Sequence, residues 1–115
     1  TGLRSLSPKD EKYRPYFSSD LREKQISYFN GPAFPWLLGP YIEAYLKVYK
    51  HSGLSLIDRI MVEIENEMSN DCIGSISELY DSSPPFIAHG AYSFAMSVAE
   101  VLRAMKLVEQ YDNTK

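Results

Sequence analysis

Apolar and polar residues recur along the chain in patterns that predict three helices. In the first, at about 35–51, apolar residues recur at helical spacing: Tyr41, Ile42, Tyr45, Leu46 and Tyr49. The second, at about 55–68, has one apolar stripe and one charged side, which is typical of an amphipathic surface helix. The third, at about 91–110, is apolar around most of its circumference, which favours burial on several sides. These patterns predict an all-α fold.

Individual residues indicate where the helices begin and end. Pro35 suits a helix start, because its missing amide loses no hydrogen bond there. Gly39-Pro40 predicts either a bend in the first helix or a delayed start. Gly53 is the expected stop of this helix, and Ser55 is the expected N-cap of the second.

The segment before Pro35 lacks a helical pattern and is expected to be loop, with room for one brief strand within Gly2–Pro8. Its aromatic residues interleave with polar ones: Tyr13, Tyr16, Phe17, Tyr28 and Phe29. Such rings can stack on sugars, but packing a long loop against helices is their commoner use. Irregular segments of this length are often functional, so both interpretations stay open.

Size and composition narrow the class of protein. The chain has 115 residues, enough for one domain or a piece of one, and its start without Met suggests an excised fragment. Its hydrophobic content of 44% argues against disorder. The formal net charge of -3, without a basic cluster, argues against a nucleic-acid surface. The apolar runs are too short to span a bilayer. The lone Cys72 excludes an internal disulfide and favours a cytoplasmic location.

The candidate chemistry lies in one stretch, residues 74–81. This stretch falls between two predicted helices and carries an acid, Glu78, among small and apolar residues, with Pro84-Pro85 close behind it. A carboxylate on a stiff loop is a reasonable general base, although hydrolysis of a sugar–sugar bond needs a second carboxyl group. The same residues also fit a capping box, in which Ser75 and Glu78 satisfy the free amides of a helix start.

Other catalytic motifs are missing from the sequence. It has no Gly-rich phosphate loop, no His-Glu-x-x-His and no Gly-x-Ser-x-Gly. Ser75 and Ser77 have no histidine in register, so nothing visible would activate a serine nucleophile. We interpret His51 and His89 as structural, and we expect no metal and no cofactor.

Four blocks of sequence follow one another along almost the whole chain. The first is Gly2-Leu3-Arg4-Ser5-Leu6-Ser7-Pro8-x-Asp10-x-x-Tyr13, and the second is Pro35-Trp36-Leu37-Leu38-Gly39-Pro40-Tyr41-Ile42-Glu43-Ala44-Tyr45-Leu46. The third is Gly74-Ser75-Ile76-Ser77-Glu78-Leu79-Tyr80-Asp81-x-x-Pro84-Pro85, and the fourth is Ser97-Val98-Ala99-Glu100-Val101-Leu102-Arg103-Ala104. In this order and spacing they resemble the C-terminal part of the glycogen debranching enzymes, the amylo-α-1,6-glucosidase family.

The resemblance implies that residues 1–115 are a C-terminal fragment of a catalytic domain, forming the last helices of an (α/α)6 toroid. It implies inverting hydrolysis of α-1,6 branch glucose in glycogen-like glucans by two acidic residues. Glu78 matches the family's general base, whereas the general acid lies far upstream. An inverting pair stands roughly 6.5–9.5 Å apart, which leaves room for a water. The candidate substrate-binding residues are Trp36, Tyr28 and Tyr80, and we expect Trp36 and Tyr80 to line the concavity that Glu78 faces.

The chain departs from the family's usual pattern at three places. Where the family reads Arg-x-Arg-Asp, this chain has Arg22-Glu23-Lys24-Gln25. The family's Tyr-His-x-Gly-Thr-Val-Trp-Pro-Trp is here Tyr28-Phe29-Asn30-Gly31-Pro32-Ala33-Phe34-Pro35-Trp36, and its Gln-Ala-Trp is Phe94-Ala95-Met96. Hydrogen-bonding groups and indoles are lost, while Trp36 and Glu78 stay. We therefore expect the scaffold to be kept and the pocket to be altered.

Three functions fit these observations. In the first hypothesis, the chain is a piece of a debranching-type glucosidase and is inactive alone because the general acid is absent from it. In the second, the chain is a glycan-binding remnant of that fold without catalysis. The third hypothesis is a helical interaction module. The expected partners are an α-glucan and the rest of the parent chain, with no nucleic acid and no membrane. Because the third helix has more apolar surface than its neighbours can cover, we also expect a homodimer through this helix or through Phe29 and Phe34.

Overall fold

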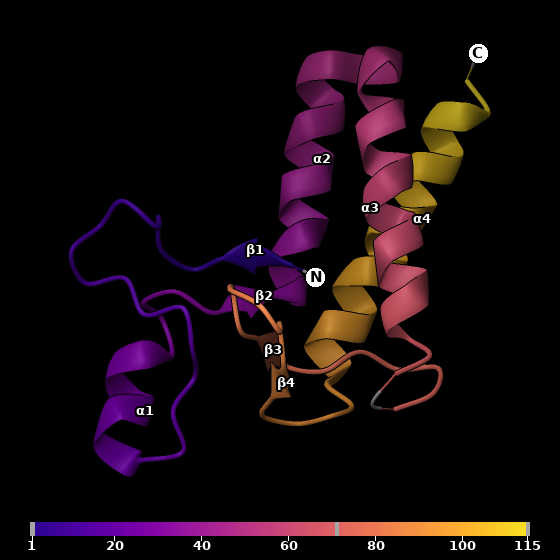
Figure 1. Cartoon of the computed structure of the whole chain (residues 1–115). Helices are drawn as coiled ribbons and strands as arrows, with labels where there is room; N and C mark the ends of the chain where they lie inside the picture. Colours follow the sequence, from indigo (N-terminus) through magenta and orange to yellow (C-terminus); the bar gives the residue numbers. More distant parts are fainter. Residues whose placement is uncertain (1, 71, 115) are drawn as a thin grey trace.

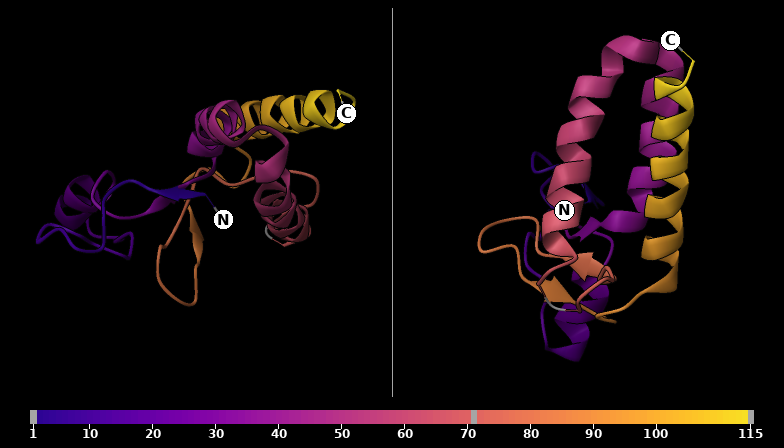
Figure 2. Two further views of the ribbon diagram at one scale, coloured as in Figure 1. Left: turned by 90° about the horizontal axis from the view of Figure 1, so that it is seen from above. Right: turned by 90° about the vertical axis from the view of Figure 1, so that its right-hand side faces the viewer.

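The computed structural model describes residues 2–70 and 72–114. Its elements are, in chain order, β1 (Leu3–Arg4), α1 (Leu21–Ser27), β2 (Ala33–Phe34), the 3₁₀ turn η1 (Pro35–Leu37), α2 (Leu38–Tyr49), η2 (Lys50–Gly53), α3 (Leu54–Glu67), β3 (Leu79–Tyr80), β4 (Ala88–His89) and α4 (Ala95–Asp112). Figure 1 shows α2, α3 and α4 at one end of the molecule, the short strands at their foot, and α1 standing apart beyond the strands. The two further views in Figure 2 show that α4 runs along α2, whereas α3 meets this pair at η2.

The first helical segment begins where the sequence indicates and ends differently. The chain is helical from Pro35, but Gly39-Pro40 delays the α-helix to Leu38 after the 3₁₀ turn. Pro40 then falls in the first turn, where backbone amides have no partner within the helix. The expected stop at Gly53 is wrong, because α2 ends at Tyr49 and Lys50 takes the positive φ of 50°. Gly53 serves another purpose, since a Cβ there would lie 2.8 Å from the ring of Tyr45.

The apolar stripes of the three longer helices meet in one core, as the periodicity predicts. The core side chains are Leu38, Ile42, Leu46, Leu54, Ile57, Met61, Ile64, Ile76, Val101, Ala104 and Val108. The expected N-cap at Ser55 is wrong: α3 begins at Leu54, and its N-cap Gly53 offers no side-chain hydrogen bond. The preceding 3₁₀ turn, η2, instead continues directly into α3 and holds the start of this helix.

Helix α4 is buried along one stripe only, and not on most sides. Ser97, Val101, Ala104 and Val108 face the core, whereas Met96 is 49% and Leu102 58% exposed. The first helical residue is Ala95, because Phe94 has an extended conformation and its amide donates to the Ile76 carbonyl at 3.0 Å. Residues 91–94 therefore belong to the loop and not to the helix.

Helix α1 lies in the segment before Pro35, where the sequence predicts loop. Asp20 is its N-cap, and the side chain of Asp20 accepts a hydrogen bond from the amide of Glu23 at 3.3 Å. An acidic N-cap followed by Glu three residues later is a helix-start pattern. The signal was present in the sequence, but the exposed helix has no long apolar stripe to reveal it by periodicity.

The all-α expectation is confirmed for the helical layer and wrong in one respect, because the described residues also form a small antiparallel sheet. The strand order is β1-β2-β3-β4, with register Leu3↔Phe34, Ala33↔Tyr80 and Leu79↔His89. The brief strand expected within Gly2–Pro8 is β1. The other strands have two residues each, too few to produce a period-2 pattern in the sequence.

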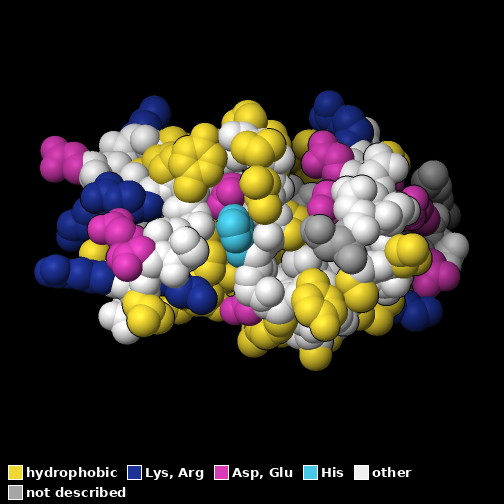
Figure 3. Space-filling view, turned by 60° about the horizontal axis from the view of Figure 1, so that its bottom comes forward, with side chains coloured by type: hydrophobic (Ala, Val, Ile, Leu, Met, Phe, Trp, Pro, Cys, Tyr) yellow, Lys and Arg dark blue, Asp and Glu magenta, His cyan; other side chains and the backbone are white. Residues whose placement is uncertain are grey.

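The surface at the foot of the helices mixes apolar and charged groups. Figure 3 shows apolar side chains scattered over this face, with Lys and Arg gathered toward the end that α1 occupies. Within the described part of the chain, no helix combines the length and the apolar character that crossing a membrane requires.

The core packing predicts the effect of truncating α3. Ile57 is fully buried, so we expect Ile57→Ala to lower the free energy of unfolding by about 2–5 kcal/mol, through lost burial and the cavity left behind. Urea unfolding followed by circular dichroism measures this change. Val62, on the same helix, is 55% exposed, so Val62→Ala should change the free energy of unfolding by no more than about 0.5 kcal/mol. Equal effects of the two substitutions would contradict the packing described here.

Candidate active site

Glu78 lies in a bend directly before β3, partly exposed. Its amide donates to the carbonyl of Ala91 at 2.8 Å, which ties the bend to the segment after β4. The capping-box interpretation is wrong, because no helix begins at Ser75 in the described structure. The Ser75 hydroxyl instead pairs with the hydroxyl of Ser93 at 2.7 Å. As expected, Glu78 lies outside any helix, on a supported loop.

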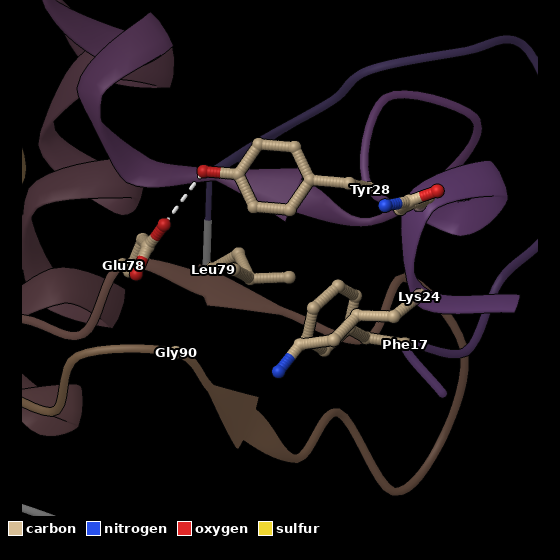
Figure 4. Close-up of a pocket in the computed structure, with 7 residues that line it drawn as sticks. Phe17, Lys24, Tyr28, Glu78, Leu79 and Gly90 are labelled. Atoms are coloured by element: carbon tan, nitrogen blue, oxygen red, sulfur yellow. Dashed lines mark hydrogen bonds between the residues drawn. The ribbon is translucent and has the colours of Figure 1, made fainter. Parts of the chain in front are cut away.

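Each oxygen of the Glu78 carboxylate accepts one hydrogen bond. The Tyr28 hydroxyl donates to Oε1 at 2.6 Å, and the Ala91 amide donates to Oε2 at 3.0 Å. Figure 4 shows the Tyr28 ring reaching across from the α1 side to the carboxylate. An ionised carboxylate has about four acceptor sites, so two hydrogen bonds fix its orientation and leave acceptor capacity for a water or a substrate hydroxyl.

Gly90 makes room for this carboxylate. Its φ of +70° lies in the left-handed region, and a Cβ at this position would come 2.4 Å from Glu78 Oε2. A side chain here would be strained by the backbone conformation and would also collide with the carboxylate. The absence of a side chain at Gly90 therefore lets the chain after β4 approach Glu78 closely enough for the Ala91 hydrogen bond.

Glu78 opens on a pocket of about 360 Å³ that α1 and the preceding loop help to enclose. The lining residues are Phe17, Lys24, Gln25, Tyr28, Glu78, Leu79 and Gly90. Among them Glu78 is the one carboxylate. The Lys24 ammonium lies 5.4 Å from the centroid of the Phe17 ring, a cation–π distance. Figure 4 shows both side chains on the wall opposite Glu78.

Sequence reasoning missed three residues of this wall as site residues: Phe17, Lys24 and Gln25. The sequence predicts a loop at Lys24 and Gln25, and Phe17 is one of several aromatic residues in that predicted loop. The pattern of Asp20 followed by Glu23 could have placed Lys24 and Gln25 on a helix. Nothing local in the sequence relates this helix to Glu78, because the two meet through tertiary contacts alone.

The expected concavity, lined by Trp36 and Tyr80, is not the one that Glu78 faces. Tyr80 is 2% exposed, and its hydroxyl accepts from the Ser77 amide at 3.4 Å, so its ring is not available to stack on a sugar. This correction follows from strand pairing, since Tyr80 pairs with both Ala33 and Ala88.

Trp36 lines a neighbouring, mainly apolar pocket of about 500 Å³. The residues around it are Ser5, Tyr28, Phe29, Phe34, Trp36, Leu37, Phe94 and Met96. Tyr28 contributes to both pockets. The structure thus brings Tyr28 to Glu78, whereas Trp36 lines only the second of these two pockets.

The surroundings of Tyr28 keep its hydroxyl protonated. Partial burial, the hydrogen bond to Glu78 and the negative charge of Glu78 together raise the pKa of Tyr28 from 10.0 to about 12. The hydroxyl therefore remains a hydrogen-bond donor to the carboxylate throughout the neutral range.

This shift predicts the alkaline behaviour of the protein. The folded chain holds the Tyr28 proton more tightly than the unfolded chain. The stability that this provides is therefore complete below about pH 10, and it is lost as the pH rises toward about 12. The titration of Tyr28 is identified by comparison with Tyr28→Phe: the part of the ultraviolet phenolate signal that this variant lacks belongs to Tyr28. In Glu78→Gln the midpoint should fall part of the way toward 10.0, because the charge is lost while burial remains. An unchanged midpoint in Glu78→Gln would contradict the contact.

Comparison with known proteins adds one match. Neither the comparison with curated proteins nor that with solved structures gives a match. A family model described as amylo-alpha-1,6-glucosidase matches residues 1–103, which is most of the chain. This range contains every residue of both pockets, including Glu78 with its two hydrogen-bond donors. The chain belongs to the amylo-alpha-1,6-glucosidase family.

Proposed function

We propose that this chain provides the general base, Glu78, of a glucosidase that hydrolyses α-1,6-linked branch glucose in glycogen-like glucans with inversion. The observation that carries the proposal is the position and orientation of the Glu78 carboxylate. It lies within the matched family region, it faces a pocket, and each of its oxygens is oriented by one hydrogen bond. A carboxylate held in this way has the orientation and the free lone pairs that a base needs to accept a proton from water.

The pocket has a suitable mixture of groups for one sugar ring. The Phe17 ring offers an apolar face, and the Lys24 ammonium and the Gln25 amide offer hydrogen-bond donors beside it. Lys24 and Gln25 stand where the family pattern has Arg and Asp, so hydrogen-bonding groups are retained, although Lys24 has a different shape from Arg and Gln25 lacks the charge of Asp. This supports a sugar substrate and a changed preference among sugars.

The second carboxyl group of the reaction must come from elsewhere. Among the residues that line the pocket, Glu78 alone carries a carboxylate. An inverting mechanism needs an acid roughly 6.5–9.5 Å from the base, on the other side of the bond that is cleaved. We therefore propose that the acid belongs to the upstream part of a longer parent chain, whose helices complete an (α/α)6 toroid with α2, α3 and α4.

The test is glucose release from a branched glucan by the full-length parent. Because general-base catalysis contributes about 10²–10⁴-fold, we expect Glu78→Gln to lower kcat by that factor, with little change in KM. Glu65, exposed on α3, provides the matched control, and Glu65→Gln should leave kcat unchanged. Proton NMR should find β-glucose formed first, as inversion at an α-linkage requires. Formation of α-glucose first, or full activity of Glu78→Gln, would contradict the proposal. The chain of residues 1–115 alone should release no glucose.

A second candidate function, self-association, is favoured by the apolar pocket beside the site. The positions that depart from the family pattern toward apolar residues include Phe29, Phe34, Phe94 and Met96, and all four line this pocket. Phe29 is 69% exposed and Met96 is 49% exposed at its edge. Apolar surface of this kind is costly to leave in water and commonly becomes an interface. We propose that a second copy of this chain covers it in a two-fold dimer when the chain is on its own.

Sedimentation of the isolated chain at micromolar concentration checks this proposal. We expect a dimer that Phe29→Asp converts to monomer, because a buried charge at the pocket edge would be unpaired. Val48 is 71% exposed on α2 and lies outside this pocket, so Val48→Asp should leave the dimer intact. A folded monomer, or a dimer indifferent to Phe29→Asp, would refute it.

A further inference from the structure

Asp81 is a buried carboxylate one residue beyond β3, outside the pocket that Glu78 faces. It is 4% exposed, and its Oδ1 accepts a hydrogen bond from the Phe17 amide at 2.8 Å. The same oxygen lies 2.9 Å from His89 Nε2, at the end of β4. Burying a carboxylate costs free energy unless partners compensate it, and Asp81 obtains these partners from two segments far apart in the sequence.

The contact with His89 is a close polar pair. The Nε2 and Oδ1 atoms are close together, but they are not aligned as a hydrogen bond requires. Nε2 is also shielded from water. When His89 is protonated, the contact is an ion pair in a largely buried setting. The His89 ring also packs on Phe17, with centroids 5.4 Å apart. Asp81 further fixes the loop before β4 through its own amide, which donates to the Ile87 carbonyl at 2.9 Å.

From this pair, two chains of contacts lead to the two oxygens of Glu78. Phe17, held by Asp81, meets the edge of the Tyr28 ring at a centroid distance of 5.9 Å, and Tyr28 donates to Oε1. On the other side, His89 directly precedes Gly90 and Ala91, and the Ala91 amide donates to Oε2. Figure 4 shows Phe17, Tyr28 and Glu78 around the pocket, with the Gly90 segment beneath them. The Asp81–His89 pair is therefore linked to both donors of the Glu78 carboxylate, to Tyr28 through Phe17 and to the Ala91 amide through Gly90.

We propose that Asp81 and His89 are positioning residues for Glu78. They act through Phe17 and through the Gly90–Ala91 segment, and they do not contact the substrate. The inference rests on the proposed function in so far as Glu78 is the base. Its geometric content, that the Asp81–His89 contact keeps the Ala91 amide and Tyr28 on the Glu78 carboxylate, is testable without any catalysis.

The alternative is that the pair serves only to hold the β3–β4 hairpin. Apolar side chains of similar size can often replace a buried ion pair at little cost in stability, so stability alone does not separate the two roles. The two roles are separated by a measurement that reports directly on the Glu78 carboxylate and its hydrogen bond. The Ala91 amide proton does so, because its hydrogen bond to Oε2 makes its chemical shift follow the protonation of that carboxylate.

The experiment is a pH titration of the ¹⁵N-labelled chain, followed by the Ala91 amide resonance. The reference is Glu78→Gln, in which the carboxylate-linked shift of Ala91 must vanish. We expect this shift to be lost or strongly reduced in Asp81→Asn, which retains an acceptor for the Phe17 amide. The same loss is expected in His89→Phe, which retains a ring against Phe17. Both variants should keep the helical circular dichroism of the wild type.

The chain offers matched controls for both substitutions. Asp58→Asn removes a charge from an exposed position on α3, and His51→Phe alters the histidine that contacts the Tyr111 carbonyl near the end of α4. Neither substitution should change the Ala91 titration. An unchanged titration in folded Asp81→Asn and His89→Phe would overturn the proposal. Global unfolding of Asp81→Asn, His89→Phe and the uncharged double variant Asp81→Asn/His89→Gln would also overturn it, because the pair would then be required for the fold itself.

In the full-length parent, Asp81→Asn should lower kcat for glucose release and leave KM nearly unchanged, since the pair lies outside the pocket. The two proposals fail in different ways. If the parent releases no glucose while the Ala91 titration responds to Asp81→Asn, the proposed function is wrong and the positioning role stands. If Glu78→Gln abolishes activity while Asp81→Asn changes neither kcat nor the Ala91 titration, the positioning role is wrong and the proposed function stands.

Discussion

Pairing between four very short backbone segments holds the functional end of this protein together. Each strand has two residues, and a ribbon of this size has no stability of its own in water. The sheet forms because other contacts fix its ends: β2 runs directly into η1 and α2, and the loop after β4 leads into α4. The helical core therefore stabilises the sheet, and the sheet in turn determines where Glu78 lies.

This arrangement explains how a carboxylate can be held firmly on an irregular segment. Glu78 precedes β3 by one residue, so the pairing of Leu79 with His89 sets its place relative to Gly90 and Ala91. The hydrogen bonds in both directions between Glu78 and Ala91 then fix the carboxylate from one side. Tyr28 fixes it from the other side, across 50 residues of sequence. A pre-oriented acceptor costs little reorganisation when a reaction takes place, and electrostatic catalysis depends on such preorganisation.

Tyr28 lines two pockets of different chemistry. On the Glu78 side the lining includes an ammonium, an amide and a carboxylate, which are the groups that bind hydroxyl-rich ligands. On the Trp36 side the lining is mainly aromatic and aliphatic, with Ser5, Tyr28 and Trp36 as the residues that carry a polar side-chain group. Sugars need hydrogen-bond partners as well as rings to stack on, so the second pocket is better suited to an apolar occupant. Four of the departures from the family pattern, Phe29, Phe34, Phe94 and Met96, thus fall together around the pocket that Glu78 does not line.

The sequence alone determined the helical layer, because long apolar stripes have a period that only a helix can bury. It also indicated Glu78, through a motif match in a stretch of small and apolar residues. The sequence did not reveal the sheet, whose strands are shorter than one detectable period. It also left α1 undetected, since this helix is held by a cap and not by an apolar face.

Only the tertiary structure decided which residues surround Glu78. Tyr80 is near Glu78 in sequence, but it is buried by pairing on both sides. Trp36 lines a different pocket, while Phe17, Lys24 and Gln25 reach the Glu78 pocket from a distant segment. The buried pair of Asp81 and His89 likewise forms only when β3 and β4 come together. The physical reason is that periodicity reports which face of one element is buried, whereas a site depends on contacts between elements whose sequences do not specify one another.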